Sequence, residues 1–244
     1  MSRKRVLLVA ALAVIVAVTA WNYPMTYRIG VDGKVCEKKI PFYAKACGFL
    51  YRDWAYKDLV SGIIGREEDE TRKALAILDW TDINIMRGIP SGLKTMDDHP
   101  LNIIIRQYGA VDQIEDVFTI LCSYAGMEAG WDKCYNADRS KNVILSFVKV
   151  SGRWLVFDAS QNKYFMNVEG EIASVDDCAG GNVIMSNEDV ASYGEYLKNI
   201  KGAYREYSTR PDQQKPFRRV IFELKKRLNI KWNKQTLWKK KRKK

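Results

Sequence analysis

The sequence predicts an α+β fold, in which a central helix packs on an antiparallel sheet between N-terminal and C-terminal helices. Three observations lead to this prediction. Apolar residues recur at three- and four-residue spacing before residue 126, which is typical of amphipathic helices. Strand-like runs separated by Gly-containing turns follow up to residue 158. A helical pattern returns from about residue 187, and this segregation of helices from strands is typical of α+β folds.

The N-terminus has the features of a signal peptide or a membrane anchor. Three basic residues precede Val6–Trp21, an uncharged run of 16 residues. A helix that spans a bilayer needs about 20 apolar residues, so the run is short for a stable span. The small residues Val18, Thr19 and Ala20 suit cleavage. Residues 1–23 therefore predict an exported or membrane-anchored protein of the extracytoplasmic space, with the basic flank inside.

The region before the core, residues 24–68, is expected to hold a linker and a helix. Residues 24–35 have the composition of an extended linker with a turn at Asp32-Gly33. Helical periodicity then extends from about Phe42 to Ile64.

A clearer helix is predicted in DETRKALAILDWTDINI, which begins at Asp69. Asp69 or Thr71 can cap its start. The face expected to be buried consists of Ala74, Ile77, Leu78 and Thr81. The turn-rich sequence RGIPSGLKTMDDHP that follows predicts a loop.

The central helix is predicted in YGAVDQIEDVFTILCSYAG, residues 108–126. Its apolar residues at helical spacing are Val111, Ile114, Val117, Phe118, Leu121, Cys122 and Ala125. Gly126 is well placed as the C-terminal cap, because glycine adopts the left-handed conformation that often ends a helix.

Strands are predicted after this helix. The run NVILSFVKV, residues 142–150, is apolar on both faces, which indicates a central strand covered on each side. GWDKCY is a shorter strand before it, and Ser151-Gly152 makes a tight turn into RWLVFDAS. Glu169-Gly170 offers another turn, and helices return at about Asn187 to Tyr207.

Most of the positive charge lies in the last 30 residues. The net charge is +11, but residues 215–244 hold 14 basic residues and one acid, a sum of +13, so residues 1–214 sum to −2. Residues 217–228 are apolar on one face, which predicts a basic amphipathic helix for an anionic membrane or cell-envelope surface. The residues expected to bind that surface are Arg218, Arg219, Lys225, Lys226, Arg227, Trp232 and Trp238. Nucleic acid is the less favoured partner, because its binding domains usually spread basic residues over a folded face.

The cysteines and the single histidine predict neither a metal site nor a cofactor. No CxxC spacing is present, and His99 is the only histidine, so a zinc site is not supported. In an exported chain, Cys36 and Cys47 can close a small disulfide loop. The remaining cysteines, expected to be buried or paired, are Cys122, Cys134 and Cys178.

Two motifs, taken in order, resemble the core of bacterial transglutaminase-like proteins, which are relatives of papain-type cysteine proteases. They are GAVDQIEDVFTILCSYAG and the hairpin VKVSGRWLVFD. In that family a Gly-x-Cys-Asp-Gln turn opens a helix that ends in Ala-Gly. A strand that begins with His follows, and then Gly-x-Trp leads into a strand that ends in Asp. The resemblance covers about residues 69–178. It implies a transglutaminase-like core at 69–185, followed by a C-terminal helix at 186–214 and the basic segment 215–244.

The resemblance also implies where a catalytic triad would stand. The cysteine position falls on Val111, the histidine position on Asn142 or Val143, and the aspartate position on Asp158. Valine cannot form a thiolate, and neither asparagine nor valine takes up a proton near pH 7. Two of the three catalytic groups are therefore absent from these positions.

The implied function is that of a pseudoenzyme, a degenerate domain that binds a peptide or a polysaccharide. The candidate binding residues are Asp112, Gln113 and Asp158. Two alternatives stay open. A structural factor would bind anionic surfaces through the C-terminal tail, and an active hydrolase or transamidase would use relocated groups.

The relocated groups can be named. A thiol enzyme would use Cys122 or Cys134 with His99 as its base, although Cys122 lies about 16 Å along the helix from Val111. Its spacing favours a core position, and His99 is expected in an exposed loop. An acid-type hydrolase would use Asp112, Glu115 and Asp158, but the first two more simply complement the helix dipole.

Overall fold

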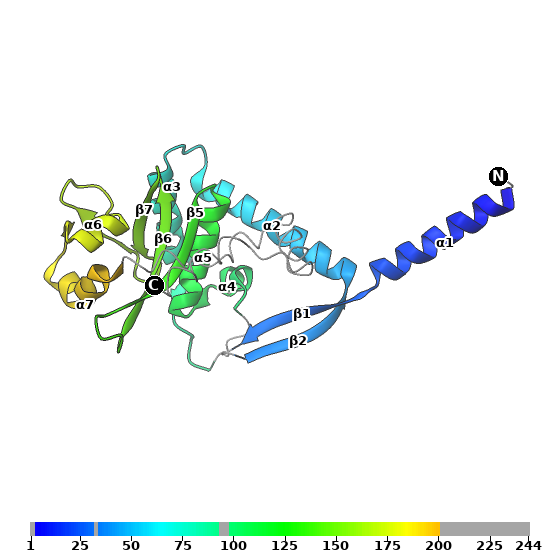
Figure 1. Ribbon diagram of the computed structural model, residues 1–244, viewed down its shortest axis with the longest axis horizontal. Coiled ribbons are helices and arrows are strands. Elements are labelled where there is room, and N and C mark those ends of the chain that lie inside the picture. Colours follow the sequence, from blue (N-terminus) through cyan, green and yellow to red (C-terminus); the bar gives the residue numbers. More distant parts are fainter. Residues whose placement is uncertain (1–2, 32–33, 93–97, 201–244) are drawn as a thin grey trace, which may run out of the picture.

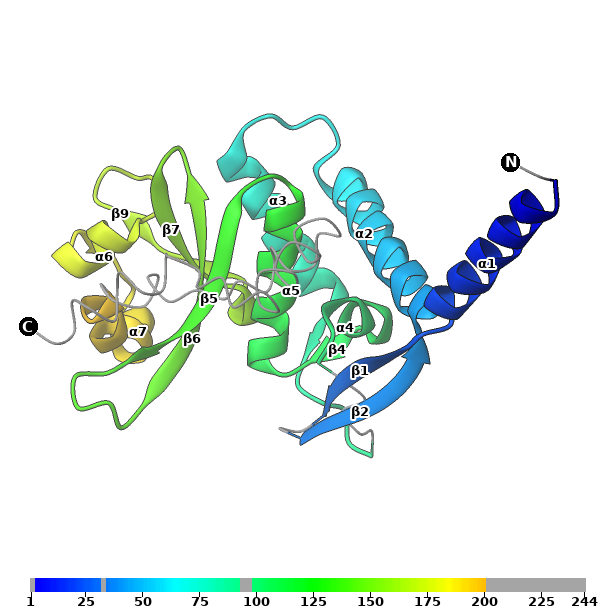
Figure 2. The ribbon, with the colours of Figure 1, turned by 45° about the vertical axis from the view of Figure 1, so that its right-hand side comes forward.

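A four-stranded antiparallel sheet and one buried helix organise the protein. The computed structural model describes residues 3–31, 34–92 and 98–200. The sheet has the order β5-β6-β7-β8, and its strands are Glu128–Tyr135, Asn142–Val150, Arg153–Asp158 and Lys163–Tyr164. Helix α5 (Val111–Tyr124) lies against one face, and α6 (Val175–Gly180) and α7 (Asn187–Lys198) lie on the other side (Figures 1 and 2). The predicted α+β fold, with a central helix on an antiparallel sheet, is confirmed.

The side chains of β6 alternate between two hydrophobic cores, because successive residues of a strand point to opposite faces. Val148 packs in the core that contains α5, whereas Leu145 and Phe147 pack in the core beside α6 and α7. The strand is therefore covered on both faces, as its apolar sequence predicts. The two-residue turn to β7 is also as predicted, with positive φ angles of 48° at Ser151 and 84° at Gly152.

Three helices surround α5 on its side of the sheet: α2 (Phe42–Ile64), α3 (Glu70–Asn84) and α4 (Pro100–Arg106). Helix α3 begins where its sequence predicts, since the Asp69 carboxylate accepts a 2.8 Å hydrogen bond from the Arg72 backbone N–H. The four residues of its predicted face are all buried. Helix α2 contributes Tyr56 and Val60 to the same core. Helix α5 ends at Tyr124 with Ala125 as its C-cap, and Gly126 follows with φ 101°.

Two parts of the chain differ from the prediction. The expected linker is a β-hairpin of β1 (Pro24–Val31) and β2 (Lys34–Pro41), paired along the full length of both strands. The expected loop after α3 contains β3 (Met86–Arg87), which pairs in parallel with β4 (Tyr108–Gly109), and it ends at α4. Both strands of that parallel pair are two residues long and α4 has seven, so neither leaves a periodic signal in the sequence.

The remaining short elements connect the sheet to α6 and α7. They are the 3₁₀ helix η1 (Ala159–Gln161) and the antiparallel pair β9 (Met166–Asn167) and β10 (Val183–Ile184). Within residues 187–200 the predicted helix is present as α7, while its expected end at Tyr207 and the whole basic tail lie outside the described residues.

The N-terminal helix α1 (Arg3–Trp21) projects away from the rest of the molecule (Figure 1). In residues 3–31, 34–92 and 98–200, no helix is both long enough and apolar enough to cross a membrane.

The proposed disulfide between Cys36 and Cys47 is wrong, because both residues are free thiols, as are the other three cysteines. Cys36 lies in β2, five residues before Pro41, and an extended strand covers about 16 Å over that length. Cys47 lies in the second turn of α2, which leaves Pro41 in another direction (Figure 2). Because β2 and α2 lead away from Pro41 in different directions, Cys36 and Cys47 lie apart.

Candidate functional site

The N-terminal end of α5 holds the position that the family resemblance assigns to the nucleophile. Ala110 is its N-cap and Val111 is its first residue, half-buried, with Asp112 exposed beside it. The preceding Gly109 allows α4 to approach closely. A Cβ added to Gly109 would lie 3.1 Å from Ile103 Cγ2, which is tighter than ordinary van der Waals contact. This end of α5 is thus built as a close turn, and its first side chain has no ionisable group.

Gln113 holds this turn together. Its side-chain oxygen accepts hydrogen bonds from Arg106 Nη2 at 2.7 Å and from the Ala110 backbone N–H at 3.1 Å, and its Nε2 donates to Asp98 Oδ1 at 2.6 Å. The side chain is buried. The amide predicted to bind a ligand is therefore engaged within the chain, where it joins the start of α5 to both ends of α4.

His99 has a structural position beside this network. It is the N-cap of α4, and its Nδ1 accepts a 3.3 Å hydrogen bond from the Leu101 backbone N–H. The residue is half-buried. His99 is the last loop residue before α4, as expected, but the expected exposure is wrong. The reason is that α4 starts directly after this residue, with Pro100 at its first position.

The strand positions that the resemblance assigns to histidine lie on opposite faces of β6. Ser146 contacts α5, and Asn142 lies four residues earlier, so both belong to the α5 face. Val143 belongs to the other face and packs with Leu145 in the second core. Asn142 is exposed at the start of the strand, opposite Tyr135. Of the two candidates, Asn142 is the one on the side of the sheet that α5 covers.

Asp158, the predicted aspartate position, is the last residue of β7 and is buried, with 5% of its surface exposed. Its Oδ1 accepts hydrogen bonds from Ser160 Oγ at 2.7 Å and from the Gln161 backbone N–H at 3.1 Å. Its Oδ2 accepts a 2.7 Å hydrogen bond from the Tyr193 hydroxyl. The carboxylate therefore caps η1 and joins the sheet to α7.

A second carboxyl group, Glu115, is fully buried next to this one. Its Oε1 accepts a 2.9 Å hydrogen bond from the Ser160 backbone N–H, and its Oε2 accepts a hydrogen bond from Ser146 Oγ. Ser160 therefore touches both acids, through its N–H on one side and its hydroxyl on the other. Glu115 also lies one turn after Val111, on the same face of α5, so that face turns toward η1 and β6.

Burial and mutual repulsion control the charge of this acid pair. Burial raises the pKa of Glu115 well above its ordinary value, and the negative charge of Asp158 raises it further. Burial and the same Asp158 carboxylate also raise the pKa of the Tyr193 hydroxyl. The pair can therefore hold a proton on Glu115, while Asp158 accepts hydrogen bonds from three donors. Asp112, the third acid of the predicted acid-type site, is exposed on the first turn and is not part of this network.

The three buried cysteines are poor nucleophiles. Burial raises the pKa of Cys122 well above its ordinary value, raises the pKa of Cys134, and raises the pKa of Cys178 to about 12. Only the thiolate form is a nucleophile, and these environments disfavour it. Cys122 lies in the core around α5, as its spacing predicts, whereas Cys134 and Cys178 share the second core.

The sequence analysis did not identify most of the residues that hydrogen-bond to Glu115 and Asp158. Ser146, Ser160 and Tyr193 come from β6, η1 and α7, and they meet at the acid pair only in the folded chain. A Ser two residues after a strand-end Asp is a local signal for a turn bonded by side chains, so Ser160 was accessible to sequence reasoning. Within the described part of the chain, no group of three or more His, Cys, Asp or Glu side chains could hold a metal ion.

Comparisons with known proteins give a limited likeness. No protein-family model matches the chain, and no curated protein matches it. Three solved structures are similar over part of their length. They are a proposed cysteine protease from Cytophaga hutchinsonii (19% identity, TM-score 0.39), a proposed protease from Parabacteroides distasonis (14%, 0.36) and a TGase (12%, 0.35). The matches cover 53%, 57% and 55% of this chain and 45%, 36% and 43% of those proteins. The chain therefore spans less than half the length of each.

Proposed function

We propose that this chain is a transglutaminase-like pseudoenzyme, exported and membrane-associated, which binds a peptide or a polysaccharide at the N-terminal end of α5. One observation carries the proposal: α5 begins at Val111, so no thiol stands where the resemblance expects the nucleophile. Asn142, on the α5 face of β6, is the residue we assign to the histidine position. Asp158 keeps the third position, but its carboxylate is engaged with Ser160, Gln161 and Tyr193.

The electrostatics support binding over catalysis. Burial disfavours the thiolate at Cys122, Cys134 and Cys178. The acid pair is enclosed by hydrogen-bond donors of the chain itself, which leaves no exposed carboxylate there to act on a substrate. In contrast, Asp112 on the first turn of α5 and Asn142 at the start of β6 are exposed. Free N–H groups of a helix start favour contact with a polar ligand.

The first test is an activity assay on the purified full chain. Ammonia release from a glutamine-containing peptide is measured with and without iodoacetamide. We expect no rate that alkylation removes, and a robust alkylation-sensitive rate would overturn the pseudoenzyme proposal. The double variant V111C/N142H is the matched control. Its new thiol at a helix start should react with iodoacetamide faster than Cys47 at pH 7, because the helix terminus favours the thiolate.

Binding is tested on the same protein by backbone amide shifts in nuclear magnetic resonance. The glutamine-containing peptide and dextran, an uncharged polysaccharide, serve as the two probes. We expect shifts concentrated at Asp112 and Asn142. Affinity should be severalfold weaker in Asp112→Ala than in Glu68→Ala, which removes another exposed acid elsewhere. Shifts confined to other surfaces would contradict the proposed location.

Association with an anionic surface is the second part of the proposal. It is motivated by the 14 basic residues of 215–244, which lie outside the described residues. Binding to vesicles that contain phosphatidylglycerol should fall steeply as salt is added, because exposed charges are screened. Binding that does not respond to salt would count against this part.

A further inference from the structure

Helix α2 carries an exposed apolar stripe along its N-terminal half. The stripe consists of Tyr43, Cys47, Leu50, Tyr51 and Trp54, which recur at three- and four-residue spacing and therefore lie on one face. Each is exposed, with 57% of Tyr51 and 59% of Trp54 accessible. The opposite face of the helix packs on the core through Tyr56 and Val60. Large aromatic side chains are costly to leave in water, so a contiguous stripe of them indicates a contact surface.

The stripe is confined to the half of α2 next to α1. Farther along the same side of the helix, the exposed residues are Lys57, Asp58 and Ser61. The surface thus changes from aromatic to charged and polar with distance from α1. Cys47 and Ser61 are 14 residues apart, which is about 20 Å along the helix. The gradient therefore matches an environment that is apolar near Cys47 and aqueous near Ser61.

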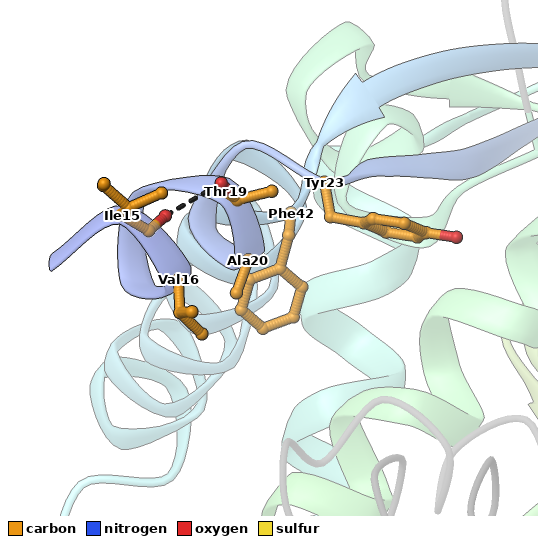
Figure 3. Close-up of a pocket in the computed structure, with 6 residues that line it drawn as sticks. All are labelled: Ile15, Val16, Thr19, Ala20, Tyr23 and Phe42. Atoms are coloured by element: carbon orange, nitrogen blue, oxygen red, sulfur yellow. Dashed lines mark hydrogen bonds between the residues drawn. The ribbon is translucent and has the colours of Figure 1, made fainter. Parts of the chain in front are cut away.

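Aromatic rings join the stripe to the end of α1. The ring of Trp21 lies 6.2 Å from that of Phe42 in an edge-on arrangement and 6.3 Å from that of Tyr43 in a stacked one. An open apolar hollow adjoins them, lined by Ile15, Val16, Thr19, Ala20, Tyr23 and Phe42 (Figure 3). In Figure 3 the ring of Phe42, at the start of α2, lies beside Ala20, whereas the ring of Tyr23 extends away from the α1 side chains.

Helix α1 continues the same surface. Its large apolar side chains between Val6 and Val18 are 48% to 72% exposed, and they occur on every side of the helix. The chain near the junction is also basic. Residues 23–58 hold seven Lys or Arg and four Asp or Glu, and Lys38 and Lys39 are exposed on β2. An apolar surface bordered by basic residues is complementary to a bilayer with anionic headgroups.

We propose that the α2 stripe lies in the headgroup region of a phospholipid bilayer and fixes the orientation of the folded body relative to the membrane. The basic border of the surface favours this occupant over a second copy of the chain, which would bring the same positive charges to the contact. Trp and Tyr have an apolar body and a polar tip, and they concentrate at the level where a membrane meets water. The inference rests on the membrane association proposed above, but it concerns a different surface from the basic tail.

The experiment uses spin labels on the full chain with vesicles of phosphatidylcholine and phosphatidylglycerol. Cys47 lies in the stripe, and Cys36→Ser removes the other exposed thiol. The matched control carries the label at S61C in a chain with Cys36→Ser and Cys47→Ser. Collision rates with oxygen, which partitions into lipid, and with a nickel chelate, which stays in water, are measured for each label.

The expected result is an oxygen-to-nickel collision ratio severalfold higher at position 47 than at 61. If the protein floats with the vesicles but both labels collide mainly with nickel, the inference fails while membrane association stands. A label at 47 that is shielded from both reagents would show a protein partner, and would also overturn the inference. A chain that does not float with vesicles at all overturns both proposals.

Discussion

Two regions of this molecule depart from the usual distribution of side chains, and they do so in opposite directions. Around α5 the chain buries acids: Asp53, Glu115, Asp116 and Asp158. Along α1 and the first half of α2 it exposes large apolar side chains. The first arrangement costs free energy unless the acids are hydrogen-bonded, and the second costs free energy unless something covers the surface.

The acids around α5 find their partners within the chain. Tyr124 donates to Asp53 at 3.0 Å and Trp131 Nε1 donates to Asp116 at 2.6 Å, while Ser160 contacts both Glu115 and Asp158. The α2 stripe is still largely exposed after folding. The fold itself therefore accounts for the acid pair, whereas the α2 stripe requires a partner outside the fold.

The largest expected effect separates buried from exposed aromatic residues. Phe118 is fully buried and its ring lies 5.3 Å from that of Phe157. Phe118→Ala should lower the free energy of unfolding by about 3–5 kcal/mol, the usual cost of removing a core Phe. Trp54→Ala, a truncation of similar size on the stripe, should change it by no more than about 0.5 kcal/mol. Urea denaturation of both variants in detergent measures the difference, and a large loss for Trp54→Ala would mean that the stripe belongs to the core.

The sequence predicts those parts of the fold that depend on local features. Helix α3 was predictable because its cap at Asp69 and its buried face from Ala74 to Thr81 are both local features. The start of α5 at Val111 and the strand end at Asp158 were predictable for the same reason. The β1–β2 hairpin was missed although residues 25–31 alternate between apolar and other residues and lead into Asp32-Gly33, which is a local hairpin signal.

The candidate site was predicted in position but not in detail. Glu115 and Ser146 are 31 residues apart in the chain, and Tyr193 and Asp158 are 35 apart. Contacts over such distances depend on how α7 and β6 pack, and no local pattern specifies them. The sequence also left Asn142 and Val143 as alternatives, and only the alternation of β6 between its two cores separates them.

A smaller effect is expected from breaking the acid network at Asp158. Asp158→Ala removes the acceptor of the Tyr193 hydroxyl and of two further donors. A buried donor without a partner costs about 1–3 kcal/mol, which corresponds to about 2–4 °C in Tm per kcal/mol for a chain of this size. Asp112→Ala, at an exposed acid of the same helix–sheet unit, should leave Tm almost unchanged. Equal Tm values for the two variants would contradict the structural role given to Asp158.

The smallest expected effect is a change in the pH dependence of stability in Glu115→Gln. Glutamine keeps the size of the side chain, and its amide can donate to Ser146 Oγ and accept from the Ser160 N–H. Because burial and Asp158 raise the pKa of Glu115 in the folded chain, the folded state still holds a proton that the unfolded state releases above pH of about 4.3. The contribution of this group to stability is therefore present at low pH and decreases as pH rises.

Glutamine has no proton to lose, so the stability of Glu115→Gln should gain on that of the wild type as pH rises from 5 to 8. We expect the difference to grow over this pH range, because the wild type loses this contribution and the variant does not. Urea denaturation at several pH values measures it, and Glu68→Gln makes the same chemical change at an exposed carboxylate. If both variants follow the wild type at every pH, Glu115 is ionised in the folded chain. A buried, ionised Glu115 would then need a positively charged partner. The acid pair, like the α2 stripe, would depend on a partner outside the described residues.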